Sequence, residues 1–578
     1  MQKRGFARLA KVAVFLLIMT AMFLAFTGCR QDADEAHREA VLARLPDLAP
    51  MQRFEETVTL TSVTNSELEP HFNTGHSMEH NMNTILLYER LNIVVEYDWI
   101  VAAEAYDTRV NLMIATGDMP DFFMVNSIRT YLDLIEDGQI WDLTEWYDAL
   151  ATPRLRQVND SAPALFNQAV INGNLYGMPI MGNVSDSVQL MWIRKDWLDA
   201  SGLPAPTTVD ELEHLARVFM EMNPGAHGIA IGPEMPLSLG QAFGAHLRIW
   251  IRDDNDQIVF GDVQPEMRNA VTRLNQWFNE GIIHREFIQH EMWSGVWGEH
   301  AAQDLVGIAF FPSFAAGWPF GTINDITIVD GDYATRSRTQ LFEPHPIPTI
   351  DGRAATTQTW TSANRFWVVN QASYYPDALI QMINNDVLLL PADEAAALNN
   401  RWVTLFGEDF TPDHFTFPIW YVEPESTIEN SNVVFAMIEA GDPIQGASNH
   451  GWDADDPRIP GLVDAFENVM GWLDPDNFPA AGNSMSNYYW WLHNKMVGDL
   501  YVLPGSPGSM IFDQNIGTPP PSMIEFMTTL NDFMDEVILR IIIGESSPDN
   551  WDQYIQQWHD MGGAQVTREM NEMHNADE

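Results

Sequence analysis

Two carboxylates, Asp118 and Asp121, stand three residues apart where an expected helix meets an expected strand. Such a pair could supply the acid and the base that cleave a glycosidic bond. Aspartates also accept hydrogen bonds from backbone amides in turns. In a chain with 80 acidic residues, acid pairs occur everywhere. We therefore favour a structural role for both residues and expect no catalytic residue here.

Three histidines, His71, His76 and His80, are the next candidates for chemistry. Imidazoles at this spacing can bind zinc, but the segment is polar, which favours a solvated loop. The chain also lacks the signatures G-x-S-x-G, G-x-G-x-x-G, H-E-x-x-H and the phosphate-binding loop. We expect no metal, no cofactor and no enzyme activity.

The only cysteine, Cys29, follows a basic start and an apolar run over residues 12–26. This run is too short for a relaxed membrane span. The pattern predicts a lipoprotein signal peptide over residues 1–28, with a lipid on Cys29 that anchors the chain outside the cell membrane, on the extracellular or periplasmic side. Phe26 supports the alternative, a structural cysteine behind an ordinary signal. Residues 29–54 read as a tether.

The formal net charge is −50, from 80 acidic and 30 basic residues. Such a chain repels phosphate backbones, so we exclude nucleic acid as a partner. A polyanionic ligand is disfavoured unless a local basic pocket offsets the field. Hydrophobic residues make up 46% of the chain, which indicates a folded protein.

Along the chain, patterns typical of strands and helices alternate in two successive sets. The first set predicts a parallel sheet covered by helices; its segments are residues 56–63, 84–91, 93–97, 106–116 and 122–125. In the second set, Thr208 and Glu211 form a capping box before a helix; the other segments are residues 188–193, 265–279 and 305–311. Helices dominate after residues 365–369. We expect two α/β lobes with helical C-terminal additions.

Five segments in order resemble bacterial family-1 extracellular solute-binding proteins, in the lipoprotein branch near the oligosaccharide and alginate binders. The most specific are residues 111–123, with the sequence NLMIATGDMPDFF, and residues 192–212, which begin WIRKDWLDASGLP. The others are residues 172–179, 264–287 and 365–384. Some members carry a calcium loop, but the matching residues 222–229 have no carboxylate, so we expect no calcium there.

The resemblance implies a periplasmic-binding-protein-like fold with a multi-strand hinge. Lobe 1 would hold residues 55–178 and about 365–450. Lobe 2 would hold residues 179–364 and part of 451–578. Such a receptor closes on a solute, expected to be an oligosaccharide, and presents it to the transmembrane subunits of an ABC permease. We expect a monomer. Two alternatives stay open: a surface polysaccharide-degrading enzyme, and the same receptor fold used for peptides or as a sensor.

Sugar sites pair flat aromatic rings with amides and carboxylates, and ligands of open α/β folds sit beyond the carboxyl ends of strands. For a receptor of this family, these rules select side chains after expected strands and beside expected lobe crossings. We predict that these residues contact the solute: Asn65, Glu79, Asn126, Ser127, Tyr176, Trp192, Trp318 and Trp360.

Overall fold

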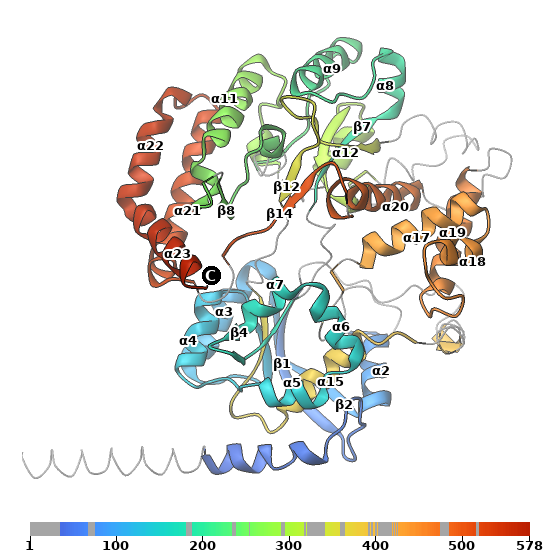
Figure 1. The fold of residues 1–578 in the computed structure, drawn as a ribbon, viewed down its shortest axis with the longest axis vertical. Helices are drawn as coiled ribbons and strands as arrows, with labels where there is room; N and C mark the ends of the chain where they lie inside the picture. Colours follow the sequence, from blue (N-terminus) through green and yellow to red (C-terminus); the bar gives the residue numbers. More distant parts are fainter. Residues whose placement is uncertain are drawn as a thin grey trace, which may run out of the picture.

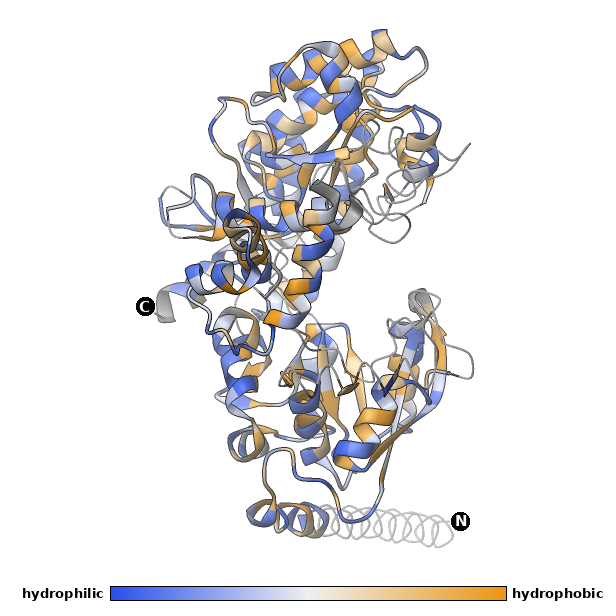
Figure 2. Cartoon of the chain, turned by 90° about the vertical axis from the view of Figure 1, so that its right-hand side faces the viewer, coloured by the Kyte–Doolittle hydropathy of each residue, from blue (hydrophilic) through white to orange (hydrophobic). Residues whose placement is uncertain are grey.

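Two lobes lie one above the other, each built around its own apolar core (Figures 1 and 2). The computed structural model describes residues 35–66, 76–180, 188–233, 239–253, 255–290, 295–316, 319–320, 342–358, 365–390, 426–473, 485–503, 505–515 and 519–577, with a few positions between 394 and 424.

Lobe 1 contains parallel strands whose carboxyl ends point the same way. β1 (Val58–Ser66) pairs in parallel with β2 (Ile93–Ala102). β3 (Phe122–Val125) lies against β1 and pairs antiparallel with β13 (Phe366–Val369), which also pairs with β6 (Met178–Pro179). The other elements of this lobe are α2 (Met82–Leu91), α3 (Ala103–Thr116), α4 (Ile128–Glu136), α5 (Thr144–Leu150), α6 (Pro153–Ser161), α7 (Pro163–Phe166), β4 (Val170–Ile171), β5 (Asn174–Leu175) and α15 (Pro376–Asp386).

Asp121 joins β1 to β3, because its carboxylate accepts hydrogen bonds from the backbone N–H and the hydroxyl of Thr61, both at 2.9 Å. Its other oxygen accepts the hydroxyl of Ser373 at 2.7 Å. Asp118 is exposed on the preceding turn. Asp121 therefore has the structural role that the sequence favoured.

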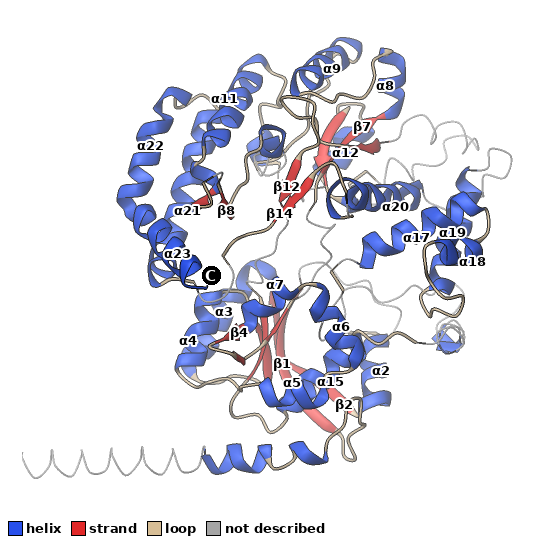
Figure 3. Ribbon diagram, in the orientation of Figure 1, coloured by secondary structure: helices blue, strands red, loops and turns tan. Residues whose placement is uncertain are grey.

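Lobe 2 is centred on β7 (Leu190–Arg194), which pairs antiparallel with β10 (Ile308–Phe311) and β11 (Phe342–His345), as Figure 3 shows in part. The capping box opens α9 (Val209–Met222) as predicted. The remaining elements are α8 (Lys195–Ser201), β8 (Trp250–Arg252), β9 (Ile258–Phe260), α11 (Pro265–Glu280), α12 (Val296–Ala302), β12 (Thr356–Gln358), β14 (Ser509–Ile511), α21 (Pro521–Ile542), α22 (Trp551–Trp558) and α23 (Ala564–Asp577).

A helical subdomain is attached to lobe 2 (Figure 1). It consists of α17 (Ser426–Ala440), α18 (Pro443–Asn449), α19 (Ile459–Leu473) and α20 (Met485–Val497). Ile428 of α17 packs with Val188 and Leu190, and α20 contacts β11. Lobe 1 therefore ends before α17, near Tyr421, whose hydroxyl bonds Asn159 in lobe 1. This boundary precedes the expected one near residue 450.

Residues 35–54, which we call the N-terminal strap, pack along the base of lobe 1 (Figure 2). Val41 is 1% exposed in the lobe 1 core. The guanidinium of Arg44 donates to both carboxylate oxygens of Asp377, at 3.0 and 2.8 Å. The backbone N–H of Met51 donates to Gln381 at 2.7 Å. The prediction of a free tether is wrong for these residues, because apolar and paired polar contacts order them.

Candidate functional site

A cavity of about 360 Å³ lies between the lobes. Lobe 1 contributes four consecutive residues at the carboxyl end of β3 and the start of α4, and lobe 2 contributes the rest of the wall. The cavity is lined by Asn126, Ser127, Ile128, Arg129, Arg248, Trp250, Phe260, Asp513, Asn515, Pro519, Met523, Ile524, Met527, Thr528 and Asn531.

Asn126 and Ser127, both predicted solute contacts, are on the lobe 1 side of this cavity. The strand β3 ends at Val125, so the two side chains follow the carboxyl end of a buried strand. Ser127 is the N-cap of α4, where its hydroxyl accepts the backbone N–H of Thr130 at 3.4 Å. The amide nitrogen of Asn126 donates to Asp107 at 2.9 Å.

Two amide oxygens in the cavity wall lack a hydrogen-bond partner among the described residues. They are Oδ1 of Asn126, in lobe 1, and Oδ1 of Asn531, on α21 in lobe 2. A buried acceptor without a partner costs about 1–3 kcal/mol. Both residues line the cavity, so a solute there would lie against one asparagine from each lobe.

The lobe 2 wall is held by two buried carboxylates. Asp262 is fully buried and accepts the backbone N–H of Arg248 at 2.6 Å. Its burial raises its pKa to about 7. Asp513 accepts the backbone N–H groups of Trp250 and Asn515, both at 3.0 Å. Burial raises the pKa of Asp513 to about 6.

Trp192 does not fit the role we predicted for it. Its side chain is 0% exposed, its indole N–H donates to the carbonyl of Phe311 at 3.0 Å, and its ring stacks on His493. The residue is buried because β7 is the central strand of its sheet and is covered on both faces. Trp192 supports the lobe 2 core and offers no surface to a solute.

The other predicted contacts lie away from this cavity or outside the described residues. Asn65 is half-buried near the end of β1. Glu79 is exposed and accepts the backbone N–H of Tyr97 at 3.5 Å. Tyr176 packs against the lobe 1 core. Outside the described residues lie Cys29, His71, Trp318 and Trp360.

Sequence reasoning missed the lobe 2 wall, which comes from residues 248–260 and 513–531. These segments carry no motif and meet only through tertiary packing. One local signal is visible in hindsight: Arg248 is a cation in a chain with few of them.

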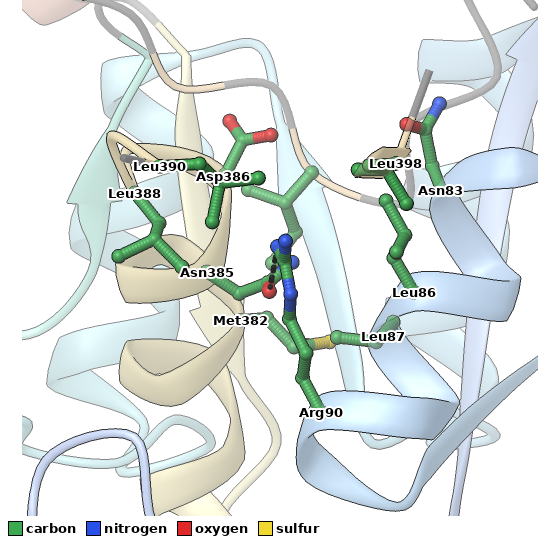
Figure 4. Close-up of a pocket in the computed structure, with 11 residues that line it drawn as sticks. Asn83, Leu86, Leu87, Arg90, Met382, Asn385, Asp386, Leu388, Leu390 and Leu398 are labelled. Carbon is green, nitrogen blue, oxygen red and sulfur yellow. Dashed lines mark hydrogen bonds between the residues drawn. The ribbon is translucent and has the colours of Figure 1, made fainter. Parts of the chain in front are cut away.

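A separate pocket of about 190 Å³ lies within lobe 1, between α2 and α15. Figure 4 shows Leu87 and Met382 facing each other there, and Arg90 bonded to Asn385 at 3.0 Å. The lining is mostly aliphatic and comes from one lobe only. This pocket therefore lacks the two-sided, polar character of the cavity between the lobes.

Four histidines meet in lobe 2, far along the chain from His76 and His80. The ring centres of His227 and His284 are 3.9 Å apart, and those of His284, His290 and His300 are 5.6 to 5.9 Å apart. No group of three or more potential ligands in the described part of the chain is arranged to hold a metal ion. Among the same residues, no helix has the length and apolarity needed to cross a bilayer.

Comparison with known proteins gives partial sequence matches and a broad structural one. Lipoprotein LipO of Bacillus subtilis is 22% identical over 227 residues, 37% of this chain and 43% of that protein. The fructooligosaccharide ABC transporter substrate-binding protein FusA of Streptococcus pneumoniae is 26% identical over 244 residues, 36% of this chain and 43% of that protein. The chain thus matches less than half the length of these relatives.

The fold is shared over nearly the whole chain with the alginate-binding protein AlgQ2, solved without calcium ion. The TM-score is 0.58 at 17% identity, over 91% of this chain and 99% of that one. The family model described as bacterial extracellular solute-binding protein matches residues 81–385. That match runs from α2 through α15 and covers more than half of the chain, so it places the chain in the family of bacterial extracellular solute-binding proteins.

Proposed function

We propose that this chain is the substrate-binding lipoprotein of an ABC importer, which captures an oligosaccharide between its lobes and delivers it to the permease. The observation that carries the proposal is a cavity lined from both lobes by polar residues, among them Asn126 of lobe 1 and Asn531 of lobe 2. Sugar hydroxyls are donors that suit both positions. FusA and AlgQ2, which share the family or the fold, are named for binding sugars.

Ligand contacts on both lobes favour a closed state, because only that state makes all of them at once. The solute would thereby convert an open receptor into a closed one. Asp121, the best candidate for a catalytic acid, is occupied in joining β1 to β3 and Ser373. This arrangement supports binding without turnover.

The proposed location is the outer side of the cell membrane, with a lipid on Cys29 as the anchor and the protein as a monomer. The basic start, the short apolar run and the single cysteine support this proposal. So does the relative named lipoprotein LipO. Mass spectrometry of the mature N-terminus tests it: a diacylglyceryl mass on Cys29 is expected, and an unmodified thiol would contradict it.

Calorimetric titration of the purified chain with a panel of oligosaccharides and peptides tests the binding function. We expect one solute per chain, with no change in the chemistry of the glycan. Asn126→Ala and Asn531→Ala should each weaken binding about fivefold to tenfold, the value of one net hydrogen bond. Asn449→Ala, at an exposed position of α18, is the matched control and should leave affinity unchanged.

Three outcomes would contradict the proposal. Glycan cleavage would favour the enzyme, and peptide binding without sugar binding would favour the peptide receptor. Equal affinity of the wild type and both asparagine variants would place the solute elsewhere.

A further inference from the structure

Most of the charged residues that line the cavity are basic, although the chain as a whole is acidic. Acidic residues outnumber basic ones by 80 to 30 in the whole sequence. Yet of the three charged residues that line the cavity, two are arginines, Arg129 from lobe 1 and Arg248 from lobe 2. The third, Asp513, is 8% exposed and accepts the backbone N–H groups of Trp250 and Asn515, so its carboxylate is directed mainly at backbone amides.

Arg248 is held in an unusual backbone conformation. Its φ is +62°, in the left-handed region that residues other than glycine, asparagine and aspartate seldom adopt. The bond from its backbone N–H to buried Asp262 maintains this conformation. Strained residues of this kind cluster at functional sites, where the strain aims a side chain.

The guanidinium groups of both arginines have partners that they can exchange. Arg129 lies 3.6 Å from Asp133, and both side chains are about 60% exposed. Arg248 bonds Asp535, whose side chain is 48% exposed, and its Nε lies 3.9 Å from buried Asp262. The bond to Asp535 is the one that a ligand can replace. Solvent-exposed pairs of this kind contribute little to stability, so a ligand carboxylate can replace them at small cost.

We propose that the solute is an acidic oligosaccharide, and that Arg129 and Arg248 hold its uronate carboxylates from opposite lobes. A guanidinium matches a carboxylate through two parallel N–H···O bonds, which gives both energy and orientation. The overall charge of −50 repels such a solute at long range. Local arginines on both lobes are the means of offsetting that field where the solute sits.

This inference rests on the proposed function, and a matched ligand pair separates the two. The acidic probe is α-1,4-linked trigalacturonate and the neutral probe is α-1,4-galactotriose, which differ only in the carboxylates. Trisaccharides from alginate test a second uronate linkage, and kestose tests a second neutral sugar. Dissociation constants are measured by calorimetry for the wild type, Arg129→Gln, Arg248→Gln, Arg248→Lys and the control Arg252→Gln.

We expect a uronate trisaccharide to bind at least about tenfold more tightly than either neutral sugar, and this preference should shrink as salt is raised. Arg129→Gln and Arg248→Gln should each weaken uronate binding about tenfold, the value of a charged hydrogen bond. The uronate affinity of Arg248→Lys should lie between that of Arg248→Gln and that of the wild type. Arg252 pairs with Asp256 outside the cavity, so its variant should bind like the wild type.

Equal or tighter binding of neutral sugars would overturn the acidic solute and leave the receptor function intact. Uronate binding that neither arginine variant weakens would overturn the assigned residues. Failure of every sugar to bind would overturn the proposed function as well. Melting curves of each variant identify any loss of affinity that comes from unfolding, and Arg248→Lys keeps the test open if Arg248→Gln does not fold.

Discussion

The carboxylate of Asp262 accepts the backbone N–H of Arg248 at 2.6 Å, and it does so from a fully buried position. Replacing Asp262 with alanine leaves that N–H without its acceptor, in a left-handed turn. We expect Asp262→Ala to lower the free energy of unfolding by about 1–3 kcal/mol, measured with urea. Asp199→Ala, at the exposed pair with Lys195, should change it by less than about 0.5 kcal/mol.

The burial of Asp262 also predicts that the free energy of unfolding depends on pH. Burial raises its pKa from the ordinary 3.8 to about 7. The folded state therefore keeps a proton that the unfolded chain has already released. The resulting stabilisation is complete below about pH 3.8 and is lost as the pH rises through 7. Asp262→Asn keeps an acceptor for Arg248 and cannot ionise, so its unfolding free energy should fall less than that of the wild type between pH 5 and about 8.

The four histidines of lobe 2 give the stability of the fold a pH dependence opposite in sign to that from Asp262. Burial lowers the pKa of His227 to about 4, with help from His284 and His300, and the pKa values of those two are lowered as well. The facing acids Glu286 and Glu299 oppose this effect only in part.

The stabilisation from these neutral imidazoles is present above the unfolded value of 6.5 and is lost as the pH falls through 4. We expect the melting temperature of the wild type to drop over this window and that of His227→Gln to drop less. His450→Gln, at an exposed site, should follow the wild type. If the melting temperatures of the wild type and His227→Gln fell by the same amount between pH 6.5 and 4, His227 would not be the source of this pH dependence.

The N-terminal strap should contribute to the stability of lobe 1. Arg44→Ala leaves the carboxylate of Asp377, which is 0% exposed, without its cation. We expect a loss of about 2 kcal/mol in the free energy of unfolding. Arg38→Ala, at an exposed position of the helix that precedes Arg44, is the control and should be nearly neutral. A strap that is released in solution would make the two variants alike.

Two glycines should respond very differently to an added methyl group. A Cβ on Gly261 would stand 1.9 Å from the carbonyl oxygen of His246, so the backbone must move. Gly117 has a φ of +73° with open space around it, and only the conformational cost remains. We expect Gly261→Ala to lose about 3 kcal/mol or more and Gly117→Ala about 1 kcal/mol, both measured by urea unfolding.

Local patterns predicted the elements of both lobes well. The apolar run of residues 122–125 is β3, the Thr208 capping box opens α9, and α11 ends at Glu280, one residue beyond the expected segment. These features depend on short stretches of chain. The strap was misread because its few apolar side chains, such as Val41, are buried only by tertiary packing in the lobe 1 core. Some of its polar partners, such as Asp377, lie more than 300 residues away in the sequence.

The cavity was predictable on one side only. Asn126 and Ser127 follow the carboxyl end of a strand, which is a local rule. Arg248, Asp513 and Asn531 reach the same cavity from three separate segments, and no local pattern links them. Trp192 was misjudged because its position in the sequence does not reveal that β7 is the central strand of its sheet.

The strap is fastened to the edge of lobe 1 where β3 begins, since His37 and Tyr374 share a cavity wall there with Gly117 and Met119. The cavity between the lobes is at the other end of β3. The proposed lipid on Cys29 would stand only six residues before the strap begins at Glu35, so it would restrain lobe 1 directly and lobe 2 only through lobe 1.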